Sequence, residues 1–143
     1  MPSIQRSALV AHSAEAMFDL VNNVEAYPEF LPGCADSKVL KQDDTSMRAS
    51  LLVAKAGLKQ WFTTHNELTT GKRIDMQLIE GPFRQLQGGW TFSSLSESAC
   101  KIELKLEFEF SSKLAEMAFG KVFSSLASSM VAAFTERAKQ VYA

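Results

Sequence analysis

The sequence is poor in the residues from which enzymes usually build reactive centres. It has two cysteines and two histidines in 143 residues, and these four do not cluster along the chain. It also lacks a Gly-x-Ser-x-Gly elbow, an HExxH helix, a glycine-rich phosphate loop and a paired-carboxylate signature. A metal site needs several such ligands close together. We therefore expect no metal, no cofactor and no catalytic residue, and we predict a protein that acts by binding.

Signals for secretion and membrane insertion are missing too. Gln5 and Arg6 interrupt the first residues, which argues against a signal peptide. No segment approaches the roughly 20 apolar residues of a membrane span. Because nothing directs the chain to an oxidising compartment, we predict that Cys34 and Cys100 are free, buried thiols. We expect a cytoplasmic protein that touches a membrane, such as the inner membrane, only peripherally.

The charges are nearly balanced, with a formal net charge of −1. The net charge therefore gives no general reason to bind DNA or an anionic membrane. An anionic partner would have to be bound by a local basic patch. Hydrophobic residues make up 46% and charged residues 22%, which is typical of a folded globular protein. The length suits one domain, residues 1–143.

The run from Phe119 to Tyr142 has the period of an amphipathic helix. A helix with so apolar a face needs a large apolar partner. Leu114 and Met117 are out of phase with this face, so a continuous helix from Ser112 would expose them, and we expect a break or kink near Gly120. The apolar stripe consists of Phe119, Phe123, Leu126, Met130, Phe134 and Val141.

The first third of the chain predicts a strand and two small helices. Residues Ser3–Val10 resemble a strand, and a helix capped by Ser13 follows. Pro28 and Pro32 cannot continue a long helix, so we expect a short helical turn and a bend there. This apolar bend either seals the edge of a core or covers a cavity.

Six strands are predicted between the bend and the C-terminal helix. Their connections are short, so the sheet should be antiparallel with neighbours in sequence order. In the last strand apolar residues alternate with Lys and Glu, so only one face is covered. Gly88 and Gly89 predict a bend or a close backbone approach. The strands are Ser37–Gln42, Met47–Lys55, Leu58–Leu68, Arg73–Glu80, Gln85–Ser94 and Ala99–Phe110.

This order of elements, together with three short strings, carries a family resemblance. The strings are Tyr27–Pro32 followed by Cys34, then Gly81–Leu86 with Gly88–Phe92, then Met130–Phe134 with Arg137 and Ala138. They resemble the START-like family of the RatA ribosome-association toxins and the mitochondrial coenzyme-Q-binding proteins, within the polyketide cyclase/dehydrase and lipid transport superfamily. The resemblance implies an α+β helix-grip fold, a curved antiparallel sheet of about seven strands wrapped around the long C-terminal helix.

The resemblance implies three functions. The first is non-enzymatic binding of an isoprenoid or lipid-like molecule, by resemblance ubiquinone, in support of respiration. The second is binding to the large (50S) ribosomal subunit, which blocks subunit association and inhibits translation. The third is a cyclase, for which His65, with Glu67 on the same strand face, is the one polar candidate; a surface polar pair is the other interpretation.

For the first function we predict a cavity between the sheet and the C-terminal helix, where the same side chains would otherwise pack as plain core. Phe83 would lie at the cavity mouth, where it could enter a membrane interface, or fold back onto the core. Arg137 lies within the apolar stripe, so it must reach solvent, pair with a carboxylate or donate to a ligand. The predicted ligand-binding residues are Tyr27, Phe30, Phe62, Phe83, Trp90, Phe123, Met130, Phe134 and Arg137.

For the second function the candidates are basic residues on neighbouring strands and loops, which would have to cluster to contact ribosomal RNA. They are Lys55, Lys59, Lys72 and Arg73.

Overall fold

A computed structural model describes residues 3–55 and 57–142, with Lys55 described in its backbone only. The chain begins with strand β1 (Ser3–Val10), helix α1 (Ala14–Asn22) and the short 3₁₀ helix η1 (Val24–Glu29). Strands β2 (Cys34–Gln42), β3 (Ser46–Lys55), β4 (Leu58–Thr69), β5 (Arg73–Glu80), β6 (Phe83–Ser96) and β7 (Ala99–Phe110) follow, and helix α2 (Lys113–Val141) ends the chain. These elements confirm the predicted order, with strand ends displaced by a few residues.

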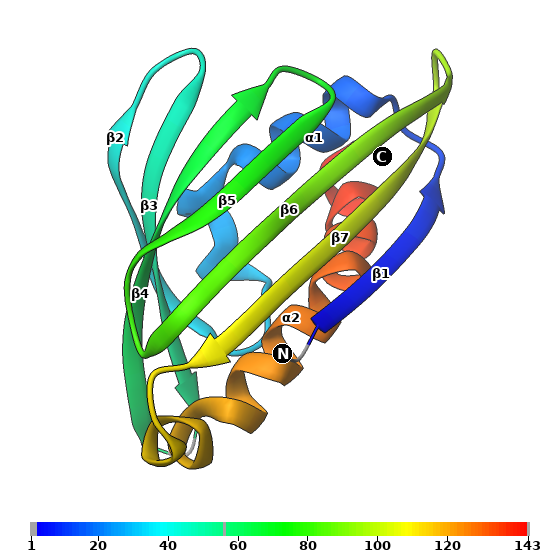
Figure 1. The fold of residues 1–143 in the computed structure, drawn as a ribbon. Helices are drawn as coiled ribbons and strands as arrows, with labels where there is room; N and C mark the ends of the chain where they lie inside the picture. Colours follow the sequence, from blue (N-terminus) through cyan, green and yellow to red (C-terminus); the bar gives the residue numbers. More distant parts are fainter. Residues whose placement is uncertain (1–2, 56, 143) are drawn as a thin grey trace.

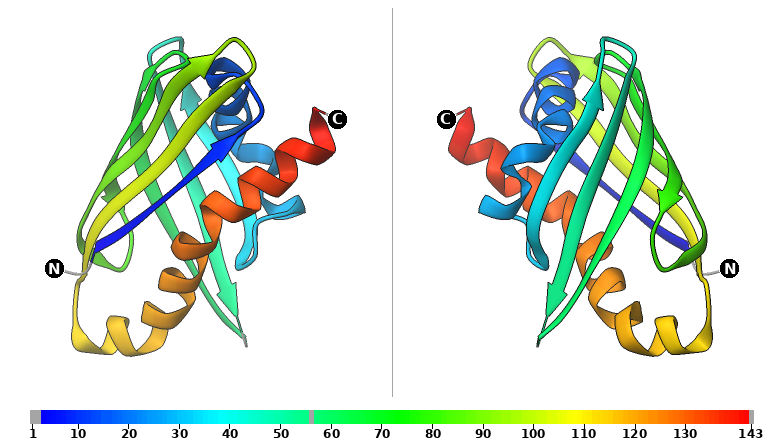
Figure 2. Two further views of the ribbon diagram at one scale, coloured as in Figure 1. Left: turned by 90° about the vertical axis from the view of Figure 1, so that its right-hand side faces the viewer. Right: turned by 90° about the vertical axis from the view of Figure 1, so that its left-hand side faces the viewer.

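The strands form one seven-stranded antiparallel sheet in the order β1-β7-β6-β5-β4-β3-β2. The sheet is strongly curved, and α1, η1 and α2 lie on its concave side (Figures 1 and 2). Along β7 the residues from Cys100 to Phe110 are alternately buried and more exposed, so the sheet has one covered and one open face. This arrangement confirms the helix-grip fold.

Gly88 and Gly89 let the central strands approach closely where the sheet bends. Their φ angles are 133° and 156°, values that L-residues with a side chain rarely adopt. A β-carbon on Gly88 would lie 2.0 Å from the carbonyl oxygen of Lys105, and one on Gly89 would lie 1.9 Å from that of Ile74. The close approach predicted from the sequence is therefore present on both sides of β6.

Helix α2 crosses the concave face of the sheet and supplies the largest part of its cover (Figure 2). Ser112 caps the helix by accepting a hydrogen bond from the amide of Ala115. Of the predicted break or kink there is no break, because one helix runs across Gly120; the helix axis bends after its first turns, as a kink would require (Figure 2). The phase argument holds: Leu114 and Met117 are 77% and 82% exposed, and the buried face begins at Val122.

On length and composition alone, α2 could cross a membrane. Its apolar stripe instead packs against β1, β7, β3 and β4, as in the core helix of a globular domain. Phe134 is fully buried at the centre of this contact, with its ring edge-on to Tyr27, Phe30 and Trp90 at centroid distances of 5.1 to 5.3 Å. Aromatic rings in this geometry attract one another beyond the effect of their burial.

Truncating the ring of Phe134 should strongly destabilise the fold. Phe134→Ala leaves a cavity among three aromatic rings, and we expect the free energy of unfolding to fall by about 3–5 kcal/mol. Met117→Ala on the exposed side of the same helix should change it by no more than about 0.5 kcal/mol. Urea unfolding followed by circular dichroism measures both values. Similar losses in the two variants would contradict this account of the core.

Candidate functional site

A cavity of about 50 Å³ lies between the concave face of the sheet and helix α2. The sheet contributes side chains from β3 to β7, and α1, η1 and α2 close the other side. Most of the lining is apolar, so the cavity has the general character of a small-molecule site. Its walls are Val21, Asn22, Val24, Tyr27, Ala49, Leu51, Phe62, Thr64, Asn66, Ile74, Met76, Leu86, Trp90, Leu106, Phe123, Leu126, Ala127 and Met130.

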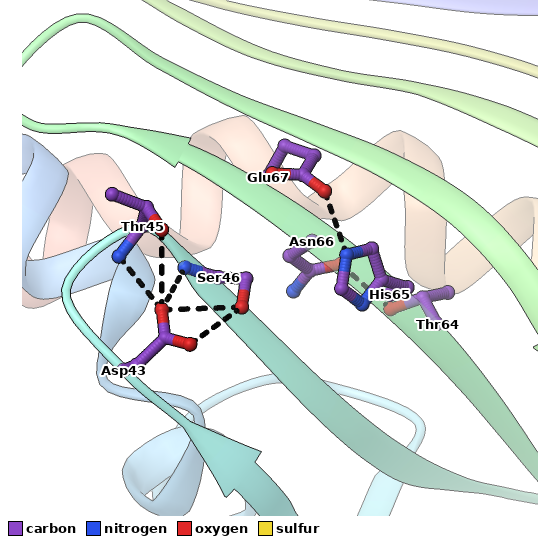
Figure 3. A network of polar contacts seen from close by, with 7 residues as sticks. All are labelled: Asp43, Thr45, Ser46, Thr64, His65, Asn66 and Glu67. Carbon is purple, nitrogen blue, oxygen red and sulfur yellow. Dashed lines mark hydrogen bonds and ion pairs between the residues drawn. The ribbon is translucent and has the colours of Figure 1, made fainter.

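Two polar side chains of β4 interrupt this apolar wall. Thr64 and Asn66 are both buried, and the Thr64 hydroxyl donates to the Asn66 side-chain oxygen at 2.8 Å. On the opposite face of the same strand, His65 bonds Glu67 at 2.7 Å. Figure 3 shows both pairs on β4. His65 therefore points away from the cavity, which leaves the surface-pair interpretation and removes the cyclase candidate from the interior.

Five of the nine predicted ligand-binding residues line the cavity: Tyr27, Phe62, Trp90, Phe123 and Met130. The other four lie elsewhere, for reasons of packing. Phe134 and Phe30 pack against each other and against Tyr27 beyond the cavity wall.

Phe83 is 6% exposed and stacks on Phe110 at a centroid distance of 4.9 Å, with Phe123 at 4.8 Å. Of the two predicted positions it takes the one folded back onto the core. It is therefore not an exposed aromatic side chain at a cavity mouth, and it lines a separate, smaller hollow with Phe119.

Arg137 joins α2 to η1 and does not enter the cavity. Its guanidinium pairs with Glu29 at 3.0 Å and lies 4.9 Å from the ring centroid of Phe30. Its Nε atom is buried without a hydrogen-bond partner among the described residues. Of the three predicted outcomes, pairing with a carboxylate is the one that the structure shows.

Burial perturbs two titratable groups near the cavity. The hydroxyl of Tyr27 donates to the carbonyl oxygen of Val21, and burial, followed by the nearby Cys34, raises the pKa of Tyr27 above its ordinary value. Burial is also the main cause that raises the pKa of Cys34 from 9.0 to about 11. Both cysteines are free and buried, as predicted. At neutral pH neither Tyr27 nor Cys34 is a ready base or nucleophile.

The predicted ribosome-contacting residues do not form one cluster. Lys59 stands near the start of β4, whereas Lys72 and Arg73 lie beyond its other end, and ten strand residues separate the two by about 33 Å. Arg73 is also paired with Asp75 at 2.8 Å. The side chain of Lys55 lies outside the described part of the structure. These residues therefore do not form the single basic patch that was predicted, because the strands place them at opposite ends of the sheet.

Other basic residues meet on the outer face of β2, β3 and β4. Lys41 is the cross-strand neighbour of Arg48, and Arg48 that of His65. The ammonium of Lys38 lies 4.7 Å from the ring centroid of Trp61 on the same face. We call Lys38, Lys41, Arg48 and Trp61 the outer basic face. Among the described residues, no group of three or more His, Cys, Asp or Glu side chains has the geometry of a metal site.

The fold and the cavity agree with the comparison to known families. A family model described as polyketide cyclase / dehydrase and lipid transport matches residues 10–135. The chain belongs to this family. Within it, the chain is 61% identical over 142 residues to the ribosome association toxin RatA of Vibrio cholerae, with 99% of each chain covered.

Two further comparisons are more distant. The mitochondrial coenzyme Q-binding protein coq10 of Schizosaccharomyces pombe is 28% identical over 138 residues, which cover 93% of this chain and 84% of that protein. The crystal structure of the Zhui aromatase/cyclase from Streptomyces sp. R1128 superposes with a TM-score of 0.86 at 16% identity, over 99% of this chain and 96% of that one. At this identity the likeness shows a shared fold and nothing about activity.

Sequence reasoning missed Thr64 and Asn66 as cavity residues. It looked for a polar interior group among titratable residues and found His65. The signal was present in the alternation of β4, because Phe62, Thr64, Asn66 and Leu68 share one face and Phe62 and Leu68 are apolar. Assigning that face to the core would have placed both polar side chains inside.

The raised pKa of Cys34 predicts a loss of stability in alkali. Above pH 9 the thiol ionises first in the unfolded chain, so the free energy of unfolding should fall between pH 9 and about pH 11. Tyr27 continues this loss at higher pH, because its pKa is raised too. Cys34→Ala removes the first contribution and should flatten the fall above pH 9. Urea unfolding at a series of pH values tests this, and equal slopes in parent and variant would refute it.

Proposed function

We propose that this protein associates with the ribosome, through the large subunit as its family resemblance implies, and so hinders subunit joining. The observation that carries the proposal is the 61% identity to a ribosome association toxin over 99% of both chains. Such identity along the whole length extends to the surface as well as the core. We place the protein in the cytoplasm, where its partner is; recovery of the protein with washed membranes rather than in the soluble fraction would argue against this.

The outer basic face supports the proposal, because it has what an RNA backbone requires. Lys38, Lys41 and Arg48 are exposed and come from two adjacent strands. Lysine and arginine bind phosphates by charge, and an aromatic ring such as Trp61 offers a surface for a base. Helices α1, η1 and α2 all lie on the concave side of the sheet, so they leave this face uncovered (Figure 1).

Acidic residues near this face are partly engaged by their neighbours. Glu67 is bonded to His65. Asp43, in the turn between β2 and β3, accepts hydrogen bonds from the amides of Thr45 and Ser46 at 2.9 and 2.8 Å (Figure 3). These bonds lower the pKa of Asp43, because they stabilise its carboxylate. Glu67 and Asp43 thus already have hydrogen-bond partners within the protein.

Charge reversal on this face should weaken ribosome binding. We expect Lys41→Glu with Arg48→Glu to reduce co-sedimentation with large subunits on sucrose gradients by about tenfold or more, because two phosphate contacts become repulsive. Raising the salt concentration should also weaken the binding of the parent protein to large subunits.

Two controls accompany this experiment. Lys72→Glu with Arg73→Glu changes the charge equally at the start of β5, two strands from β3 at the same end of the sheet, and Met130→Trp fills the cavity. Both should co-sediment as the parent does. Absence of parent binding would overturn the proposed function, and loss with the Lys72 and Arg73 pair instead would move the contact surface to the β4–β5 turn.

A second candidate function is binding of an apolar isoprenoid or lipid-like molecule in the cavity, by resemblance ubiquinone. The observation that favours it is the apolar space beside Trp90, which a fully packed core would not leave. A cavity of about 50 Å³ is smaller than the ~150 Å³ that holds a benzene ring, so a ligand must widen it. Met76 and Met130 on opposite walls are flexible enough to move aside.

The lining supports binding rather than catalysis. Tyr27 is the one titratable side chain among the cavity residues, and its hydroxyl is engaged with Val21. General acid–base chemistry needs a group whose pKa lies near the working pH. Neither the amide of Asn66 nor the hydroxyl of Thr64 supplies one.

The two tryptophans make a matched test of the ligand proposal. Trp90 lines the cavity, whereas Trp61 lies on the outer face beside Lys38. In Trp61→Phe, a short-chain ubiquinone should quench the remaining Trp90 fluorescence in a saturable way. In Trp90→Phe, the same titration should give only weak, linear quenching of Trp61. Equal quenching in both variants, with no quinone found by mass spectrometry of the purified protein, would rule out a cavity ligand of this kind.

A further inference from the structure

The Asn66 side chain presents a hydrogen-bond donor to the cavity that the protein itself does not use. Asn66 is 6% exposed and belongs to the cavity wall. Its oxygen accepts the Thr64 hydroxyl at 2.8 Å. Among the described residues its NH₂ group makes no side-chain hydrogen bond. A single hydroxyl can engage only one end of an amide, so one polar atom of Asn66 always faces the cavity.

The other polar groups of the wall are already occupied or lie at its edge. The Tyr27 hydroxyl donates to the Val21 carbonyl oxygen, and the Thr64 hydroxyl donates to Asn66. Asn22, the last residue of α1, is only half-buried. The Asn66 NH₂ group is thus the free donor in the deep part of an otherwise apolar wall.

A donor that loses its water without gaining another partner is unfavourable. Isolated buried polar groups are accordingly bonded to protein, to water or to a ligand. Water can serve here while the cavity is small. A ligand that displaces this water must bring an acceptor of its own, or the donor is left unpaired and the affinity falls.

The wall also restricts what kind of acceptor fits. No lysine, arginine or histidine lines the cavity, so a carboxylate or phosphate would be buried without a counter-charge. A ligand hydroxyl or amine brings a donor of its own, which would have to share the Asn66 oxygen with the Thr64 hydroxyl. A carbonyl oxygen on an apolar body satisfies the Asn66 donor and adds no unmet donor.

We propose that Asn66 is the residue that selects and orients a carbonyl group, of a cyclic ketone or a quinone ring, inside this cavity. The inference rests on the second candidate function, because it needs a cavity ligand. It adds the side chain that recognises that ligand and the ligand group that this side chain binds. Thr64 acts as a positioning residue that holds the Asn66 amide with its NH₂ group toward the ligand.

The test compares two probes that differ in one atom group. Cyclohexanone carries a carbonyl, and methylenecyclohexane has a CH₂ group in place of the oxygen. We expect cyclohexanone to bind the parent protein about 3- to 10-fold more tightly, the range of one hydrogen bond. Affinities come from ¹H–¹⁵N chemical-shift titration. Cyclohexanone, unlike methylenecyclohexane, should also shift the side-chain NH₂ resonances of Asn66.

Asn66→Leu should remove the preference for the ketone and leave the affinity for methylenecyclohexane equal or higher. Leucine has a similar volume but leaves the buried Thr64 hydroxyl without its acceptor, so the urea midpoint should fall modestly while the protein stays folded. The matched control is Gln77→Leu, the same change of an amide to leucine on the exposed outer face of β5. Gln77→Leu should bind cyclohexanone more tightly than methylenecyclohexane, as the parent protein does.

The outcomes separate the inference from the function on which it rests. If neither probe binds, both the cavity-ligand function and the Asn66 assignment are overturned. If both probes bind equally well and Asn66→Leu changes neither, the cavity binds ligands but Asn66 does not select a carbonyl. Should Asn66→Leu fail to fold, the Asn66 NH₂ shifts in the parent protein decide the matter without it.

Discussion

The contact between α2 and the concave face of the sheet is the constraint on which the rest of the structure depends. Phe134 is fully buried there among Tyr27, Phe30 and Trp90. Helix α2 packs against β1, β3, β4 and β7, and α1 packs against β6 and β7. The curvature that Gly88 and Gly89 permit lets the helices on the concave side cover a seven-stranded sheet, because the strands bend around them.

The same contact explains why a cavity exists beside a well-packed region. Helix α2 alone does not fill the whole hollow of a strongly curved sheet. At the C-terminal half of α2, the rings of Phe134, Tyr27 and Phe30 occupy the space, and the Glu29–Arg137 pair closes its edge. Toward the middle, smaller side chains such as Ala127 and Ala49 leave room next to Trp90. The cavity is thus a consequence of residue size along one helix.

The two candidate functions use opposite faces of the sheet. A cavity ligand would contact the concave face and α2, whereas ribosomal RNA would contact the outer face of β2, β3 and β4. Strand alternation makes this separation physically simple, since consecutive residues of β4 point to the two sides: Thr64 and Asn66 to the cavity, His65 and Glu67 to solvent. Occupation of one face therefore does not obstruct the other.

The sequence by itself determined the elements, the order of strands β2 to β7, the amphipathic phase of α2 and the exposure of Leu114 and Met117, because these follow from local periodicity and short connections. It also placed Trp90, Phe123 and Met130 on the covered side. The tertiary structure placed β1 beside β7. Only the tertiary structure decided which apolar residues border empty space, that Phe83 and Phe134 are solid core, and that Arg137 meets Glu29. These depend on distances between elements far apart in the chain. For the same reason the structure separated Lys59 from Lys72, and it showed that the polar groups facing the interior are Thr64 and Asn66.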